Sequence, residues 1–66
     1  MTITLNGDVR QIPTTYTILE LLTELEYVGK RIAVELNGDI VPKSQHANCV
    51  LKSGDSLEIV VAVGGG

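Results

Sequence analysis

Alternation of apolar and polar side chains predicts the strands of this chain. A period of two is typical of a half-buried strand, and Thr2-Ile3-Thr4-Leu5 is the simplest example. Two other runs end at Pro13 and Pro42, whose nitrogens have no hydrogen to donate to a sheet. The run 9–12 does not alternate cleanly, so the sequence leaves its register open. Strands are expected at residues 2–5, 9–12, 32–36, 39–41 and 56–63.

A period near 3.6 predicts one main helix between the second and third strands. Thr17 and Glu20 have the spacing of a capping box, which marks a helix start. Gly29 is expected to end the helix, because glycine adopts the left-handed conformation that follows many helices. The apolar face of this helix consists of four residues spaced i, i+3, i+4 and i+7, namely Ile18, Leu21, Leu22 and Leu25.

The remaining segments are turns and short irregular stretches. Asn-Gly pairs at 6–7 and 37–38 suit tight hairpins, which require positive φ angles. Residues 43–48 are polar and allow a single helical turn, and residues 49–51 are expected to pack as a short edge segment. The order is then strand, strand, helix, strand, short strand, strand. This order predicts an α+β fold of the β-grasp (ubiquitin-like) type: a mixed sheet of four to five strands packed on one main helix.

Composition limits what such a domain does. With 66 residues the chain forms one domain, 1–66, and has little volume for an enclosed active site. Eight acidic and five basic residues give a net charge of −3, which argues against nucleic acid and against an anionic membrane as partners. The single cysteine excludes a disulfide within the chain and a thiolate metal cluster. We expect a cytoplasmic protein with no bound cofactor or metal, and not an enzyme.

The feature that points to chemistry is the end of the sequence. The last strand runs directly into Gly64-Gly65-Gly66. Glycine loses much conformational freedom when it is ordered, so we expect 64–66 to be a flexible tail until it is bound. Without side chains the tail fits a narrow cleft, and three extended residues span roughly 10 Å. A frayed chain end without function is the alternative interpretation.

Several stretches resemble the ThiS family of sulfur carriers from the thiamine pathway. The similar stretches are Ala33-Val34-Glu35-Leu36-Asn37-Gly38-Asp39-Ile40-Val41-Pro42-Lys43, the turn 51–55, the strand 56–63 and the terminal Gly-Gly. The resemblance implies that a ThiF-like adenylating enzyme uses ATP to activate the carboxylate of Gly66. A cysteine desulfurase or another sulfur donor would then give a thiocarboxylate, and thiazole synthase would take the sulfur for the thiazole ring. In this scheme Gly64 and Gly65 provide reach.

Side chains outside the tail give weaker hypotheses. Val60 and Ala62 alternate with core positions, so they are expected on the exposed sheet face, either as a docking surface for partners or as ordinary strand residues. Cys49 is expected to be a small core residue, and Lys43 a solvated one. His46 lies in a polar stretch and is expected at the surface.

Other functions remain open at this stage. A sulfur carrier for molybdopterin or another pathway has the same kind of tail, and a protein modifier transfers it to lysine. A β-grasp module that binds a nucleotide or RNA without using its tail is a different class. Such a module keeps its function when Gly65 and Gly66 are deleted, whereas a carrier loses it.

Overall fold

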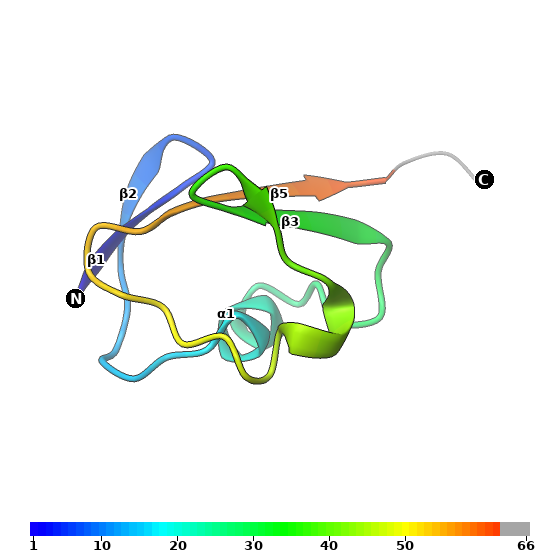
Figure 1. Cartoon of the computed structure of the whole chain (residues 1–66), viewed down its shortest axis with the longest axis horizontal. Helices are drawn as coiled ribbons and strands as arrows, with labels where there is room; N and C mark the ends of the chain where they lie inside the picture. Colours follow the sequence, from blue (N-terminus) through cyan, green and yellow to red (C-terminus); the bar gives the residue numbers. More distant parts are fainter. Residues whose placement is uncertain (63–66) are drawn as a thin grey trace.

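The computed structural model describes residues 1–62, and Figure 1 shows them as a sheet with one main helix on one side. The strand order in the sheet is β2-β1-β5-β3-β4. β1 and β5 are parallel, and the other neighbouring pairs are antiparallel. The elements are β1 (Thr2–Leu5), β2 (Asp8–Gln11), α1 (Ile18–Glu24), β3 (Ile32–Leu36), β4 (Asp39–Ile40), the 3-10 turn η1 (Lys43–Gln45) and β5 (Ser56–Val61).

The core lies between α1 and the face of the sheet that α1 covers. Period-two alternation places Val34 of β3 opposite Ile59 of β5, and both side chains are buried. Leu21 and Leu22 of α1 pack onto them from the helix side. Within residues 1–62 nine core residues are buried, and all are aliphatic: Ile3, Ile12, Ile18, Leu21, Leu22, Val34, Leu51, Leu57 and Ile59. The predicted β-grasp order is confirmed, with the last strand in the centre of the sheet.

The β1–β2 hairpin explains why the second strand alternates poorly. β2 pairs with β1 from Thr2↔Gln11 to Leu5↔Asp8, and Val9 in its middle is 75% exposed. Ile12 extends this pairing, since its amide donates to the Met1 carbonyl at 2.8 Å, and its side chain is buried. Alternation is therefore regular: Val9 faces solvent, and the core-side position between them, opposite Ile3, is occupied by the polar Arg10.

The helix begins where it was predicted and ends earlier. Thr17 caps it, and both hydrogen bonds of the capping box with Glu20 are present. The predicted end near Gly29 is wrong: α1 stops at Glu24 because Glu26 adopts a left-handed φ of 61°. The amide of Tyr27 donates to Leu22 O at 2.8 Å, and that of Glu26 donates to Thr23 O at 3.1 Å. These two bonds form a Schellman motif, with glutamate where glycine is usual.

Residues 41–51 lead the chain back under the helix. η1 supplies the predicted helical turn, and the segment then passes the start of α1. Val50 forms a single antiparallel bridge with Thr17, and Leu51 is buried in the core. This short segment therefore pairs with the entry to α1 and not with an edge of the sheet. Within residues 1–62, no helix has the length and apolarity needed to cross a bilayer.

Candidate functional site

The end of β5 is the base from which the glycine tail continues. The β3–β5 pairing runs up to Ile32↔Val61, and the amide of Ala62 still donates to Arg31 O at 2.9 Å. Val60 is 59% exposed and Ala62 is exposed, as the alternation predicts. Their role in binding a partner stays a prediction. Gly64, Gly65 and Gly66 lie outside the described residues.

A side chain that sequence reasoning missed holds β5 from the β1 side. β1 and β5 pair only at two positions, and Asn6 then leaves β1 with a left-handed φ of 50°. Its side-chain amide continues the pairing: Oδ1 accepts from the Ile59 amide at 2.7 Å, and Nδ2 donates to Ile59 O at 3.2 Å. The Asn-Gly signal predicted the turn, but nothing local in the sequence indicated a partner 53 positions away.

The second Asn-Gly turn contacts the start of β5 in a similar way. Asn37 Oδ1 accepts from the Ser56 amide at 2.9 Å, and its Nδ2 donates to Asp55 Oδ1 at 3.0 Å. Asp55 also closes its own turn by accepting from the Lys52 amide at 2.8 Å. Asparagine side chains from two hairpins therefore fix β5 at its beginning and near its middle, which defines the position of the strand that carries the tail.

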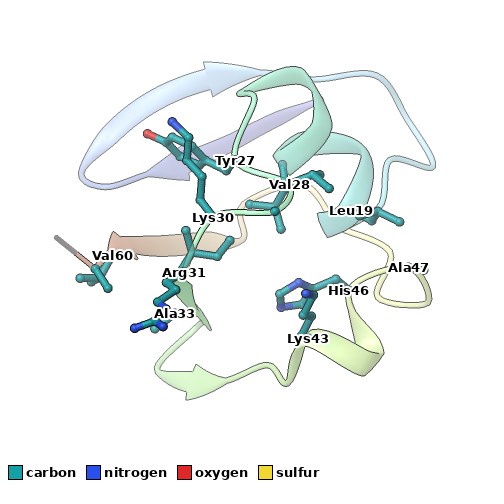
Figure 2. Close-up of a pocket in the computed structure, with 14 residues that line it drawn as sticks. Leu19, Tyr27, Val28, Lys30, Arg31, Ala33, Lys43, His46, Ala47 and Val60 are labelled. Carbon is teal, nitrogen blue, oxygen red and sulfur yellow. The ribbon is translucent and has the colours of Figure 1, made fainter. Parts of the chain in front are cut away.

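A groove opens beside the end of β5, between the loop that follows α1 and the turn η1 (Figure 2). Its volume is about 710 Å³, within the range of ligand-binding clefts. Its apolar wall includes Leu19, Val28 and Ala47, and Ala62 also belongs to its lining. We refer to this surface as the η1 groove. Its full lining is Leu19, Leu22, Tyr27, Val28, Gly29, Lys30, Arg31, Ile32, Ala33, Lys43, His46, Ala47, Val60 and Ala62.

The charge of the η1 groove is opposite to that of the chain. Lys30, Arg31 and Lys43 line it, which is three of the five basic residues of an acidic protein. None of the aspartates and glutamates within residues 1–62 lines it. Figure 2 shows Lys30 extended along Tyr27, and its ammonium lies 5.7 Å from the centre of that ring. This contact is within the distance of a cation–π interaction.

His46 corrects the prediction that this residue is a surface side chain. It is only 5% exposed and is the one buried polar or charged residue in the described part of the chain. The cause is η1: after this turn the chain passes beneath α1, and Leu19 N donates to His46 O at 3.0 Å. The imidazole Nε2 lies 3.0 Å from Val41 O. Polar neighbours in sequence concealed this burial, since the turn directs one side chain inward.

A second polar cluster lies outside the groove and joins β2 to α1. Arg10 pairs with Glu24 at 3.0 Å, and the Tyr16 hydroxyl donates to the other carboxylate oxygen at 2.7 Å. The hydrogen bond from Tyr16 is the main reason why the pKa of Glu24 is lowered, and the same bond raises the pKa of Tyr16. All three groups have structural partners, so this cluster is a tether between two elements.

The described residues offer few groups for chemistry of their own. Across residues 1–62 no three His, Cys, Asp or Glu side chains gather as metal ligands would. Cys49 is half-buried against the core, as expected for a small apolar residue. The arrangement therefore presents a fixed strand end with an adjoining groove, which is suited to binding another molecule.

Comparisons with known proteins agree with this arrangement. The model of the ThiS family matches residues 3–66. The sulfur carrier protein ThiS of Bacillus subtilis is 40% identical over 63 residues, which cover 94% of this chain and 96% of that protein. The crystal structure of a thiamine biosynthesis protein (ThiS) from Geobacter metallireducens superimposes with a TM-score of 0.84 at 29% identity, and all of both chains is covered.

One further relative is much longer. A thiazole synthase of Paramagnetospirillum magneticum is 42% identical over all 66 residues, but this chain spans only 20% of that protein. The family match, the near full-length similarity to the Bacillus protein and the shared fold all lead to the same assignment. The chain belongs to the ThiS family of sulfur carrier proteins of thiamine biosynthesis.

Proposed function

We propose that this chain carries sulfur as a thiocarboxylate on Gly66 and donates it to the thiazole ring of thiamine. The observation that supports this most is the match to the ThiS family, which extends through residue 66 and so includes the glycine tail. The position of β5 is consistent with it, because the strand that leads to the tail is the central one. Carriers of this family are co-substrates of other enzymes and not enzymes themselves.

The chemistry requires activation by a partner, because a carboxylate oxygen is a poor leaving group. A ThiF-like adenylating enzyme would use ATP to form an acyl-adenylate on Gly66, releasing pyrophosphate. A persulfide on a cysteine desulfurase would then displace AMP and form an acyl disulfide, which a thiol such as excess cysteine would reduce to the thiocarboxylate. A donor at the sulfide level would displace AMP and give the thiocarboxylate directly. Gly64 and Gly65 would thread the partner's cleft, since three extended residues span roughly 10 Å.

Thiazole synthase is the partner with independent support. The Paramagnetospirillum thiazole synthase contains a stretch similar to this entire chain within one longer polypeptide. Proteins that act together are often joined in this way, so we infer that a separate thiazole synthase accepts sulfur from this chain. Val60 and Ala62 would form part of the contact, because they are exposed at the base of the tail.

Intact mass spectrometry tests this proposal directly. The chain is incubated with its host's adenylating enzyme, ATP, a cysteine desulfurase and cysteine. We expect a mass gain equal to the exchange of one oxygen for sulfur, localised to Gly66 by fragmentation and absent without ATP. A variant without Gly65 and Gly66 is the matched control and should gain nothing. An unmodified tail, under conditions where the same enzyme modifies a known carrier, would contradict the proposal.

The acceptor is tested in a second step. Thiazole synthase and its other substrates are added to the sulfur-loaded chain, and the mass gain should disappear as thiazole forms. A loaded chain that thiazole synthase does not discharge would contradict the thiamine assignment and leave the carrier function intact. Sulfur transfer to a molybdopterin precursor would then be the next reaction to measure.

A further inference from the structure

The η1 groove selects for a negatively charged ligand that also has apolar parts. Its walls include Leu19, Val28 and Ala47, and Lys43 stands at its rim on η1. No carboxylate of residues 1–62 lines it, although acidic residues outnumber basic ones eight to five in the chain. This local reversal of charge gives complementarity to an acidic surface and opposes binding of a basic one.

His46 supplies an additional binding group inside the groove. Val41 O is a carbonyl that only accepts, so Nε2 of the imidazole carries the hydrogen in their 3.0 Å contact. When the ring carries that one hydrogen, Nδ1 is an acceptor. Nδ1 of His46 has no hydrogen-bond partner among residues 1–62. It is nevertheless accessible to a ligand, because within these residues Arg10 Nε is the only side-chain nitrogen or oxygen that is both fully buried and without a partner. Figure 2 shows the ring projecting from η1 toward Arg31 and Ala33.

These features define the ligand by its chemistry. An extended peptide provides backbone amides that can donate to His46 Nδ1, apolar side chains for the wall of Val28 and Ala47, and a carboxylate side chain for Lys43. The groove is also continuous with the base of the tail, because Ala62 belongs to its lining. A protein that receives the tail therefore lies within contact distance of the groove.

We propose that the η1 groove binds a segment of thiazole synthase in which an acidic side chain is flanked by apolar ones, while the synthase receives the tail. This inference rests on the function proposed above, which names thiazole synthase as the acceptor. The groove would act as a second contact, separate from the glycines. It would therefore contribute to affinity even when the tail is absent.

A matched pair of charge reversals tests the groove. Lys43 and Lys52 are both exposed lysines in short turns, but only Lys43 lines the groove. Lys43→Glu and Lys52→Glu change the net charge equally, so any general effect of charge is the same for both. Affinity for the host's purified thiazole synthase is measured by calorimetry with the full chain. We expect Lys43→Glu to weaken binding at least about fivefold and Lys52→Glu to stay within about twofold.

A second variant tests the apolar wall. Val28 is 57% exposed and lies outside the core, so Val28→Asp should fold, and amide spectra would verify this. It places a carboxylate where the groove has none, and we expect binding to weaken by a similar factor. In chains that lack residues 64–66, the ratio of affinities between the Lys43→Glu and Lys52→Glu variants should be preserved, because the groove acts independently of the tail.

The outcomes separate the groove from the carrier function. Equal weakening by both lysine variants, or no weakening by Lys43→Glu and Val28→Asp, overturns the groove as a contact of thiazole synthase. If Lys43→Glu and Val28→Asp weaken binding to the adenylating enzyme but not to thiazole synthase, the choice of partner is overturned. Sulfur loading of Gly66 is measured by mass spectrometry in the same preparations. This measurement tests the carrier function independently of how strongly the groove variants bind thiazole synthase.

Discussion

Asn6 is predicted to stabilise the fold through a contact that its sequence neighbours do not reveal. Its amide accepts from and donates to the backbone of Ile59, at 2.7 and 3.2 Å. β1 has already turned away at this point, so the amide replaces the next residue of the strand. Asn6→Gly removes both hydrogen bonds and keeps the left-handed turn, since glycine adopts a φ of 50° without strain.

The cost follows from the groups that lose their partner. An unsatisfied amide or carbonyl costs about 1–3 kcal/mol when it is buried. Ile59 is buried, but its partner Asn6 is exposed and both hydrogen bonds are only partly buried, so the lower end applies to each group. We expect a loss of about 2–3 kcal/mol, including the greater freedom of glycine in the unfolded chain. A domain of this size is stable by only about 3–10 kcal/mol, so the loss is a large fraction.

Asn37 provides a matched control. It has nearly the same backbone conformation, with a φ of 52°, and it also precedes a glycine. Asn37→Gly therefore changes the unfolded chain by the same amount as Asn6→Gly. Its amide, however, bonds the exposed Ser56 and the side chain of Asp55, where water replaces the lost partner. We expect Asn6→Gly to be less stable than Asn37→Gly by at least about 1 kcal/mol in urea unfolding.

A third variant, Asn6→Asp, makes the stability loss at this position depend on pH. In Asn6→Asp the ionised carboxylate still accepts from the Ile59 amide but faces Ile59 O with a negative oxygen. Protonation restores a donor, so the deficit relative to the original chain should shrink as the pH falls below the usual aspartate range. Equal stabilities of Asn6→Gly and Asn37→Gly, together with unchanged hydrogen exchange at Ile59, would show that the Asn6 hydrogen bonds to Ile59 do not stabilise the fold.

Three further predictions concern other contacts. Glu26→Gly should stabilise the chain by about 0.5–1 kcal/mol in urea unfolding, because it relieves the left-handed φ of 61° at the end of α1. His46→Phe should cost about 1–2 kcal/mol by the same measurement, since it removes the hydrogen bond to Val41 O. Glu24→Gln should destabilise at neutral pH. The pKa of Glu24 is lowered in the folded chain, first by its hydrogen bond from Tyr16. The loss of stability caused by Glu24→Gln should therefore be fully present above pH 4.5 and disappear as the pH falls through the folded-state pKa of Glu24. Unfolding across pH checks this, and an equal difference in acid would contradict it.

The elements of the fold were predictable because each is encoded by a local period. Alternation in 32–36 and the spacing of the α1 leucines depend only on near neighbours, and both appear where expected. The end of α1 was not predictable from glycine alone. Glu26 adopts the left-handed conformation because two carbonyls near the helix end accept from residues beyond it, whereas Gly29 belongs to the following turn.

The site was less predictable because its contacts join distant parts of the chain. The alternation of Val60 placed it on the exposed face, which the structure confirms. The amide of Asn6 bonds Ile59, 53 positions away. The burial of His46 depends on its packing beneath α1, where Leu19 N donates to His46 O. The η1 groove is assembled from four separate segments, so its charge could not be seen in a composition that is acidic overall.

The proposed mechanism itself explains why a second contact is needed. If Gly64–Gly66 are as flexible as the sequence predicts, a partner that orders them pays about 1–2 kcal/mol of backbone entropy per residue, or roughly 3–6 kcal/mol in total. Glycines bury no side chain, so the tail offsets this cost through backbone hydrogen bonds and contacts of its terminal carboxylate, and contributes little apolar contact. Most of the apolar contact must then come from surfaces beside the tail, and within residues 1–62 those are the end of β5 and the η1 groove. Affinity and sulfur transfer should therefore separate: groove variants weaken binding, and tail variants abolish transfer.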